Sequence, residues 1–470
     1  MKYDIVFIGN TSIDYFGNFQ QPGGGAFYSA TSASIADKKM KIAFYSKINK
    51  NTHLRQFEKL FIGEKVDADN TSFDYSCTQN KCKIRNLLSF SVKNINIETE
   101  HIHISVRKGV DDICLDNICY KTISVDVTKT SINDSRDKII KFGRIDFLFC
   151  NLEEYSSISS LNNVKTFVVT NADKSVVVFE NDVSRFFPIP LLKRYNKVVG
   201  AGDSFIGGFL SEWIKNRDLR EAVLTGTTCA HLSMTNRNQF EVSRIDYIIR
   251  RNQYRNKIRE IPNKLIVIGS AGVGKTKFVR TFVEFNPAYK LIDDYNLLMD
   301  IVEGDSEQKY TRKLPVGFEI INYRLWNDVI DAQYIEASKY KNVVYELSRG
   351  TDWSYIKNEG ITIDEIYDYA IEKFAHKEDV LIINLYVPYM VRKKRNTDRA
   401  LYGEHCVDDK TMAEVYKKTY VFSQKNIKRI KHKCKNVLQI VNISNRKWKD
   451  DITLYHYVME KALKKWRNNE

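Results

Sequence analysis

The sequence predicts a protein of two α/β domains, on three observations. Short apolar runs typical of buried strands alternate with stretches of helical periodicity. A polar, basic stretch interrupts this alternation and ends at Pro262-Asn263. Two glycine-rich signatures suited to phosphate binding stand on either side of it, Gly200-Ala201-Gly202-Asp203 and Gly269-Ser270-Ala271-Gly272-Val273-Gly274-Lys275-Thr276. A chain of 470 residues is also too long for one ordinary core.

We expect an α/β domain over residues 1–245, a basic linker over 246–262 and a parallel α/β domain over 263–470. The first domain has strand-like runs at 5–8, 42–45, 166–170 and 176–179, and the second has them at 265–268, 290–292, 343–347, 380–387 and 437–443. Helical patterns cover 26–36, the residues after Gly202, and 452–466.

The composition narrows the classes of molecule that the protein is expected to bind. A net charge of +15 favours acidic ones, namely nucleotides, phosphorylated substrates or nucleic acid. No run approaches the roughly 18 apolar residues of a membrane span, and the N-terminus lacks an export signal, so we expect a cytoplasmic protein. The cysteine pairs Cys77/Cys82 and Cys114/Cys119 lack zinc spacing and predict buried free thiols.

The first signature opens a helix. Phe205, Phe209 and Trp213 recur at helical spacing, which places Asp203 in the first turn. The free amides of that turn stabilise negative charge. A carboxylate beside them can take a proton from a hydroxyl while the amides hold a transferring phosphoryl group.

Residues 1–245 resemble the ribokinase (PfkB-type) family of carbohydrate and nucleoside kinases. The matching motifs occur in family order: Gly9-Asn10-Thr11-Ser12-Ile13-Asp14, Gly23-Gly24-Gly25, Asn151-Leu152-Glu153-Glu154 and Gly200-Ala201-Gly202-Asp203. The resemblance implies an Asp203 base and phosphate binding by Gly200, Ala201 and Gly202. It further implies that Asp14, Gly23, Gly24 and Gly25 hold acceptor hydroxyls, and that Asn151 and Glu154 organise Mg²⁺ and the ATP phosphates.

Two departures separate this sequence from the family. Lys197-Val198-Val199 replaces an acidic residue and threonines, and the acidic residue helps some members to hold a monovalent cation; a lysine ammonium could stand in the place of that ion. The segment Thr170-Asn171-Ala172-Asp173-Lys174-Ser175 lacks both glycines of the family's nucleotide turn. A ligand-binding or scaffold role for this domain therefore stays open.

The second signature follows the strand-like run 265–268 and has the full Gly-x-x-x-x-Gly-Lys-Ser/Thr spacing. We expect an exposed loop lysine at Lys275. Residues 263–470 resemble the P-loop kinase class. This resemblance implies a phosphate cradle at Gly269, Gly272 and Gly274, catalytic roles for Lys275, Asp294 and Arg395, and Mg²⁺ binding by Thr276 and Glu346. It also implies acceptor binding by Asp293 and Arg349 and phosphate clamping by Arg392, Arg395 and Arg399.

Plainer interpretations stand beside these. Asp293 or Asp294 can simply cap a helix, Asn151 and Glu154 can do the same, and the arginines can form a solvated face. We predict a bifunctional kinase that uses ATP and Mg²⁺ on hydroxyl or phosphate acceptors, with the C-terminal site the better supported catalyst. The alternatives are a nucleotide-gated switch with a metabolite-sensing N-terminal domain, or a kinase acting on a nucleic-acid base or end.

Overall fold

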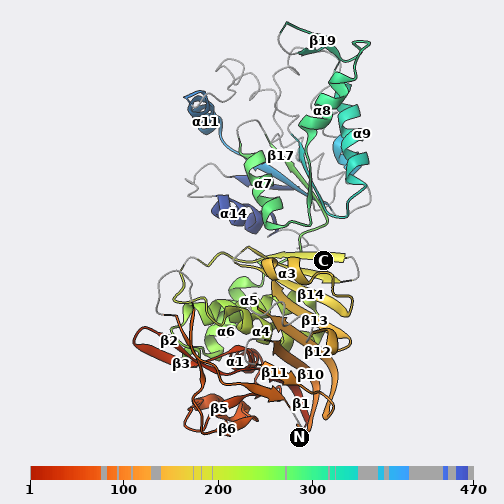
Figure 1. Ribbon diagram of the computed structural model, residues 1–470. Coiled ribbons are helices and arrows are strands. Elements are labelled where there is room, and N and C mark those ends of the chain that lie inside the picture. The colour runs from red at the N-terminus through yellow and green to blue at the C-terminus, as the bar shows by residue number, and fades with distance from the viewer. Residues whose placement is uncertain are drawn as a thin grey trace. The chain divides into compact units, whose positions relative to one another are not determined.

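The computed structural model divides the chain into two compact units, Met1–Glu260 and Ile261–Glu470 (Figure 1). It describes residues 2–75, 82–92, 95–106, 110–128, 139–172, 174–180, 183–192, 194–269, 273–315, 318–322, 324–347, 369–374, 380–401, 438–442 and 451–463. Each unit is considered by itself below.

The N-terminal unit begins with short strands and one helix, continues through long strands and ends in helices. Its elements are β1 (Lys2–Ile8), β2 (Ser12–Phe16), β3 (Phe19–Gly23), α1 (Gly25–Ala36), β4 (Ile42–Tyr45), β5 (Lys47–Asn49), η1 (Arg55–Leu60), β6 (Glu64–Val66), β7 (Thr71–Asp74), β8 (Lys83–Asn86), β9 (Phe90–Val92), β10 (Ile97–Val106), β11 (Val110–Ile113), β12 (Ile118–Val127), β13 (Ile145–Asn151), α3 (Leu152–Ile158), β14 (Val164–Asn171), β15 (Ser175–Glu180), β16 (Val183–Pro188), α4 (Ala201–Asn216), α5 (Leu219–Thr235), η3 (Gln239–Glu241) and α6 (Arg244–Tyr254). The strands and helices expected in this region are confirmed.

Eight of these strands form the main sheet, in the order β16-β15-β14-β13-β12-β10-β1-β4. The pairs from β4 to β14 are parallel, and β15 and β16 extend the sheet antiparallel. Because carboxyl ends of parallel strands meet at one edge, residues distant in sequence gather there.

The hydrophobic core lies between this sheet and a layer of helices that includes α1, α4 and α5 (Figure 1). Phe209 of α4 packs its ring edge-on against Phe149 of β13, with ring centroids 5.3 Å apart. Both side chains are almost fully buried. The apolar stripe that follows Gly202 therefore anchors α4 to the sheet and fixes the position of the helix N-terminus.

A smaller sheet of four strands, ordered β3-β2-β7-β8, stands beside the main one. Strands β2 and β3 form a hairpin in which Phe16 faces Phe19 and Asp14 faces Gln21. This hairpin carries Asp14, one of the residues expected to bind an acceptor.

The segment expected to be a basic linker over 246–262 is largely part of the N-terminal unit. It holds α6 from Asp246 onward, and Tyr247, Tyr254 and Ile258 belong to the core of that unit. The prediction was wrong here because the many charged and polar residues of α6 obscure two buried side chains on it, Tyr247 and Tyr254.

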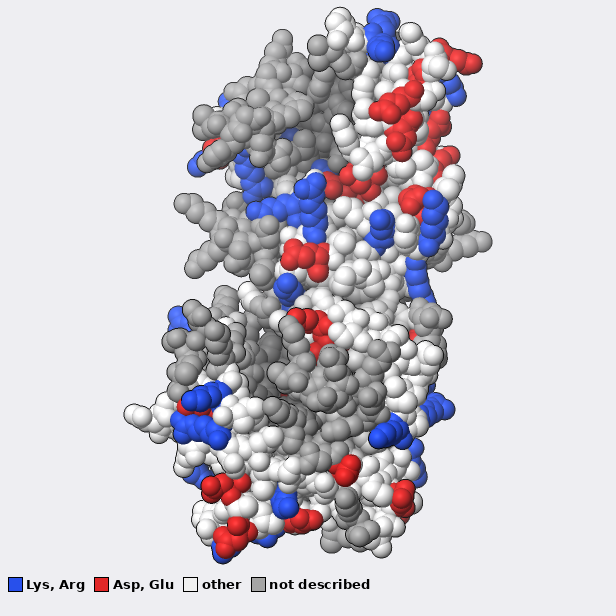
Figure 2. All heavy atoms as spheres, viewed as in Figure 1, with Lys and Arg blue, Asp and Glu red and all other residues white. Residues whose placement is uncertain are grey.

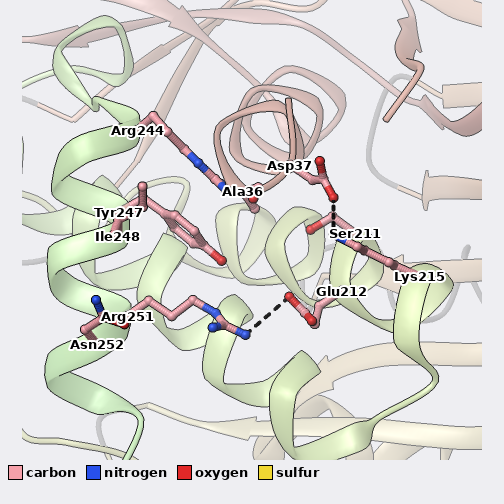
Figure 3. Close-up of a pocket in the computed structure, with 10 residues that line it drawn as sticks. All are labelled: Ala36, Asp37, Ser211, Glu212, Lys215, Arg244, Tyr247, Ile248, Arg251 and Asn252. Atoms are coloured by element: carbon pink, nitrogen blue, oxygen red, sulfur yellow. Dashed lines mark hydrogen bonds and ion pairs between the residues drawn. The ribbon is translucent and has the colours of Figure 1, made fainter. Parts of the chain in front are cut away.

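Ion pairs and hydrogen bonds also tie α6 to its neighbours, around a cavity of about 300 Å³ drawn in Figure 3. Arg251 pairs with Glu221 of α5 at 2.5 Å and with Glu212 of α4 at 3.5 Å. Arg244 donates to the carbonyl oxygens of Ile35 and Ala36 at the end of α1. A guanidinium at a helix C-terminus satisfies carbonyls that have no partner within the helix.

The C-terminal unit is a second α/β structure, and its strands match the expected runs. Its elements are β17 (Lys264–Ile268), α7 (Lys275–Phe285), β18 (Lys290–Ile292), α8 (Asp294–Glu303), β19 (Thr311–Lys313), β20 (Phe318–Ile320), α9 (Leu325–Ala337), β21 (Val343–Leu347), β22 (Val380–Tyr386), α11 (Tyr389–Leu401), β23 (Leu438–Asn442) and α14 (Asp451–Leu463). Five strands form a sheet in the order β18-β21-β17-β22-β23, and every pair in it is parallel.

Strand β17 lies at the centre of this sheet and leads through the glycine-rich segment into α7. The ring of Tyr455 on α14 packs edge-on against Phe285 of α7, with centroids 4.7 Å apart. The last helix therefore serves as core packing, as its apolar stripe predicts. Across the described parts of both units, no helix combines the length and apolar character needed to cross a membrane.

Candidate functional site

The N-terminus of α4 forms the centre of the first candidate site. Gly200 caps the helix in the left-handed region, with φ 76°, which favours glycine. Asp203 follows in the first turn and is 5% exposed. Ser29 of α1 donates a 2.9 Å hydrogen bond to the carbonyl oxygen of Asp203 and so ties this turn to α1. The amides of the turn and a carboxylate thus lie together, as the sequence predicts.

A cavity of about 190 Å³ joins this turn to the ends of β12 and β13. Its lining includes Gly202, Asp203, Asn151, Glu154 and Asp126. The structure therefore brings together four residues that the sequence analysis singled out, although they come from motifs about 50 residues apart. Asp126, at the end of β12, was missed.

Asn151 and Glu154 form a capping box at the start of α3. The Asn151 Oδ1 atom accepts from the Glu154 amide, and Glu154 Oε2 accepts from the Asn151 amide, both at 2.8 Å. The plainer interpretation of this pair is therefore confirmed. A metal role is compatible with it, because Mg²⁺ needs only one or two carboxylates when nucleotide phosphates and water complete its shell. Their contribution to Mg²⁺ stays a prediction.

Other metal centres find no support in the described residues, where no group of three or more His, Cys, Asp or Glu side chains could hold an ion. Free thiols occur at Cys82, Cys114, Cys119, Cys150 and Cys229. Cys82, Cys114 and Cys119 are exposed, so the expectation that they are buried was wrong. Cys77 lies outside the described residues.

Buried hydrogen bonds continue from Asp126 into the sheet. His103 Nε2 lies 3.2 Å from Asp126 Oδ1, and His103 Nδ1 lies 2.8 Å from Ser124 Oγ. The same hydroxyl lies 2.7 Å from His101 Nε2. Burial holds the pKa of His101 well below its usual range, with His103 and Arg217 adding to the effect. His101 and His103 belong to β10 and Ser124 and Asp126 to β12, so this network depends on strand pairing and has no local sequence signal.

Asp14, which is expected to bind an acceptor, is 1% exposed. Ser12 Oγ donates to its Oδ1 at 2.7 Å, and Tyr28 OH donates to its Oδ2 at 3.0 Å. Burial raises the pKa of Asp14 to about 6, while the two hydrogen bonds and the Lys197 charge oppose that rise. A buried carboxylate of this kind can accept a hydrogen bond from a ligand hydroxyl at neutral pH.

The triple glycine brings this carboxylate close to α1. A Cβ on Gly23 would collide with the Asp14 carboxylate. Gly24 caps α1 with φ 91°, and the helix itself begins at Gly25. The glycines are therefore explained by close approach and turn geometry, whereas their role in holding acceptor hydroxyls stays a prediction.

Tyr28 links the two halves of this site and was missed by the sequence analysis. Its side chain is buried, and a Cβ on Gly200 would come within 2.7 Å of its ring. The same ring carries the hydroxyl bonded to Asp14. The helical pattern over 26–36 carries no signal for this contact.

Lys197 lies near Asp14 and two aromatic rings. Its Nζ is 5.4 Å from the ring centroid of Tyr28 and 5.8 Å from that of Phe16. The carboxylates whose charges act on it are Asp14 and Glu241. From the sequence, the Lys197 ammonium could stand in the place of the family's monovalent cation. The contacts place it near Asp14, the residue expected to hold an acceptor.

A second cavity, of about 390 Å³, adjoins the other side of the α4 turn. Ala201, Gly202, Thr170 and Ala172 contribute to its lining. Ala172 occupies the first glycine position of the nucleotide turn and has φ 46°, in the left-handed region. A left-handed conformation at an alanine has a steric cost of roughly 1 kcal/mol.

In the C-terminal unit, the start of α7 lies against the end of β21. Thr276 Oγ1 donates a 2.7 Å hydrogen bond to Glu346 Oε1. Lys275 is 6% exposed, so the expectation of an exposed lysine was wrong. Burial raises the pKa of Glu346, the Thr276 bond and the Lys275 charge oppose the rise, and the charges of Asp294 and Asp293 add to it. A carboxylate beside a hydroxyl and an ammonium suits a Mg²⁺–phosphate site.

The acidic pair at the start of α8 divides into two roles. Asp293 Oδ1 accepts from the Tyr295 amide at 2.9 Å and caps the helix. Asp294 is 6% exposed and close enough to influence Glu346. The capping interpretation is therefore confirmed for Asp293, and a catalytic role for Asp294 stays a prediction.

Arginines of α11 reach toward the glycine-rich segment. Arg395 Nη1 donates a 3.0 Å hydrogen bond to the carbonyl oxygen of Val273, and Arg392 is 3% exposed. Figure 2 shows basic side chains gathered over α7 and α11. Because Arg392 is buried, it does not belong to a solvated arginine face. Gly272, Arg349 and the side chain of Arg399 lie outside the described residues.

Comparison with known proteins concerns the N-terminal unit. Residues 143–242 match the sequence profile of the pfkB family carbohydrate kinase. A nucleoside kinase of Methanocaldococcus jannaschii is 29% identical over 150 residues, which are 29% of this chain and 49% of that protein. A nucleoside kinase of Thermoplasma acidophilum is 24% identical over 221 residues, 43% of this chain and 76% of that protein.

The match to the M. jannaschii protein spans about half the length of that relative. The crystal structure of the M. jannaschii nucleoside kinase, described as an archaeal member of the ribokinase family, aligns with a TM-score of 0.42 at 18% identity. That alignment covers 53% of this chain and 98% of the other.

Proposed function

Because residues 143–242 form a segment of the pfkB kinase family, we propose that the N-terminal unit is an ATP-dependent kinase for a hydroxyl-bearing small molecule. The observation that carries the proposal is the cavity in which Asp203, Gly202, Asn151 and Glu154 meet at the start of α4. ATP and Mg²⁺ are its cofactors, and the acceptor is a sugar or a nucleoside. The binding partners expected for this activity are ATP and that acceptor.

In the proposed reaction, the acceptor hydroxyl attacks the γ-phosphorus of ATP while Asp203 takes the proton of that hydroxyl. The bond between the γ-phosphorus and the bridging oxygen breaks, and ADP leaves. The amides of the Gly200 to Asp203 turn stabilise the negative charge of the transferring group. Asp14 holds a second hydroxyl of the acceptor. Glu154 and Asn151 help to hold Mg²⁺, which offsets charge on the nucleotide phosphates when it is bound. The cavity beside Ala172 takes the rest of the nucleotide.

A radiolabelled-ATP assay with the full chain tests this proposal against a panel of sugars and nucleosides. Asp203→Asn should lower kcat for the accepted compound by roughly 10²-fold or more and change its KM little, because a positioned base acts mainly in the transition state. The exposed Asp67→Asn is the matched control. Equal turnover by wild type and Asp203→Asn would refute the role of Asp203.

We further propose that the C-terminal unit is a P-loop kinase domain. The Thr276–Glu346 hydrogen bond beside the buried Lys275, at the carboxyl end of a parallel sheet, supports this. Its acceptor is a nucleotide, nucleoside or phosphate-bearing molecule. Together the two sites would make the protein bifunctional.

The same measurements also test two other functions. ATP hydrolysis that is independent of every acceptor would favour a nucleotide-gated switch with a sensing N-terminal unit. Salt-sensitive binding of DNA or RNA, with transfer of label to the polynucleotide, would favour a nucleic-acid acceptor. The net charge of +15 is the observation that favours the nucleic-acid acceptor.

A further inference from the structure

Lys197 is a buried cation whose hydrogen-bonding capacity is unused. Its side chain is 8% exposed, and its Nζ finds no hydrogen-bond acceptor in the described structure. An ammonium carries three N–H donors, and burying it without acceptors is unfavourable. Such a group is expected where a ligand supplies the missing acceptors.

The surroundings keep this group charged at neutral pH. Burial lowers the pKa of Lys197 to about 8, and the carboxylates of Asp14 and Glu241 oppose that fall. The ring faces of Tyr28 and Phe16 lie 5.4 and 5.8 Å from Nζ and also favour a cation. The ammonium is therefore mostly protonated at pH 7.

Asp14 attracts this ammonium without binding it directly. Its Oδ1 accepts from Ser12 and its Oδ2 from Tyr28. The position of the carboxylate is thus fixed by two hydroxyls of the protein. Lys197 lies near enough to feel this charge and has its donors unpaired, so the two groups do not form a hydrogen-bonded ion pair.

A second cation stands over the same hairpin. The guanidinium of Arg237 lies 5.3 Å from the ring centroid of Phe19, and Phe19 faces Phe16 in the β2–β3 register. The two rings are 6.4 Å apart. Arg237 is exposed, whereas Lys197 is buried. The hairpin that carries Asp14 therefore has a buried and an exposed positive charge beside its paired Phe16 and Phe19, whereas Arg85, over Tyr15 of the same hairpin, is paired with Asp74.

We propose that Lys197 binds an oxyanion of the acceptor, so that the N-terminal unit acts on a molecule with a phosphate or carboxylate group besides its hydroxyls. An oxyanion offers several acceptor lone pairs and a compensating charge, which a neutral hydroxyl does not. Arg237 attracts the same charged molecule at the outer side of the hairpin. This inference rests on the proposed kinase function of the N-terminal unit.

Binding without nucleotide tests the inference independently of turnover. Isothermal titration of the full chain at pH 7 compares three matched pairs: ribose with ribose 5-phosphate, fructose with fructose 6-phosphate, and glucose with gluconate. The first two pairs test phosphate and the third tests carboxylate. Wild type should bind the charged member of at least one pair about tenfold more tightly or better, the scale of a desolvated charge-assisted contact.

Lys197→Met should reduce that preference to about twofold or less, since methionine keeps the length of the side chain and removes its charge. An effect of the substitution on Asp14 changes the affinities for both members of a pair, so it cancels in the ratio of the two affinities. Lys197→Arg should retain most of the preference. Lys165→Met, which removes a half-exposed lysine paired with Glu180, is the control and should leave the ratio unchanged.

Equal affinities within every pair for wild type, or an undiminished preference in Lys197→Met, would overturn the inference. If Lys197→Met loses its native circular dichroism, Arg237→Met replaces it and should lower the preference several-fold; an unchanged ratio there counts equally against the inference. Phosphorylation of neutral acceptors without any preference would refute the inference and keep the kinase function. A preference for the charged ligands in binding, with no turnover of any acceptor, would support the inference and refute the kinase function.

Discussion

The hydroxyl of Tyr28 donates a 3.0 Å hydrogen bond to Oδ2 of Asp14, while its ring lies within 2.7 Å of where a Cβ on Gly200 would stand. One buried side chain therefore touches both the carboxylate expected to hold the acceptor and the glycine turn expected to hold phosphate. Gln21 Nε2 donates to the same hydroxyl at 2.8 Å and fixes its orientation. Tyr28 is thus a positioning residue between the two halves of the proposed site.

Tyr28→Phe should raise the KM for the acceptor about 5- to 30-fold and change kcat much less. Loss of a hydrogen bond to a charged group costs about 1–2 kcal/mol. The bond also lowers the pKa of Asp14, so its loss leaves the carboxylate more often protonated at neutral pH. Steady-state kinetics at pH 7 and pH 8 measure both effects. Tyr45→Phe, which breaks a bond to Glu64 elsewhere in the unit, is the control; an equal rise in that variant would contradict the specific role of Tyr28.

The acceptor kcat/KM of wild type should fall as the pH drops through about 6, where Asp14 gains its proton. The Lys197 charge favours the ionised carboxylate, so Lys197→Met should move this acidic limb to higher pH, by about 0.5–1 unit. A pH profile with a neutral acceptor, compared with that of Lys165→Met, measures the shift. An acidic limb that stays in place or moves to lower pH in Lys197→Met would show that the two groups are not coupled.

The features predictable from the sequence are those with a local pattern. The strand-like run before Gly269 and the apolar stripe after Gly202 each specify an element by their periodicity. The position of Asp203 in the first turn of α4 follows directly from that stripe. Four residues of the phosphate-side cavity were named because their motifs are short and contiguous.

The remaining features depend on pairing between distant segments. His103 meets Ser124 and Asp126 only because β10 and β12 are parallel neighbours in one register. Lys197 meets Tyr28 through the fold of the unit, although 168 residues lie between them in the sequence. The burial of α6 had a local signal in the seven-residue spacing of Tyr247 and Tyr254, which its charged residues obscured.

Ala172→Gly should raise the stability of the protein by about 0.5–1 kcal/mol, because a glycine adopts a φ of 46° without steric cost. Ala230→Gly is the matched control: Ala230 lines the same cavity but lies inside α5, where glycine is unfavourable by about 1 kcal/mol. Urea unfolding followed by circular dichroism measures both variants. Destabilisation of the two variants to the same extent would show that the turn does not hold Ala172 in a left-handed conformation.

If both proposed sites bind nucleotide, the full chain should take up two molecules of a non-hydrolysable ATP analogue, and Lys275→Met should take up one. Lys275 begins α7 beside Thr276 and Glu346, so removing its charge weakens binding of the terminal phosphates. Because Lys275 is buried, its loss can also disturb packing, and circular dichroism must confirm that the variant is folded. Lys277→Met, on the exposed face of the same helix, should keep both binding events in calorimetry. Two sites retained in folded Lys275→Met would place nucleotide binding in the C-terminal unit away from α7.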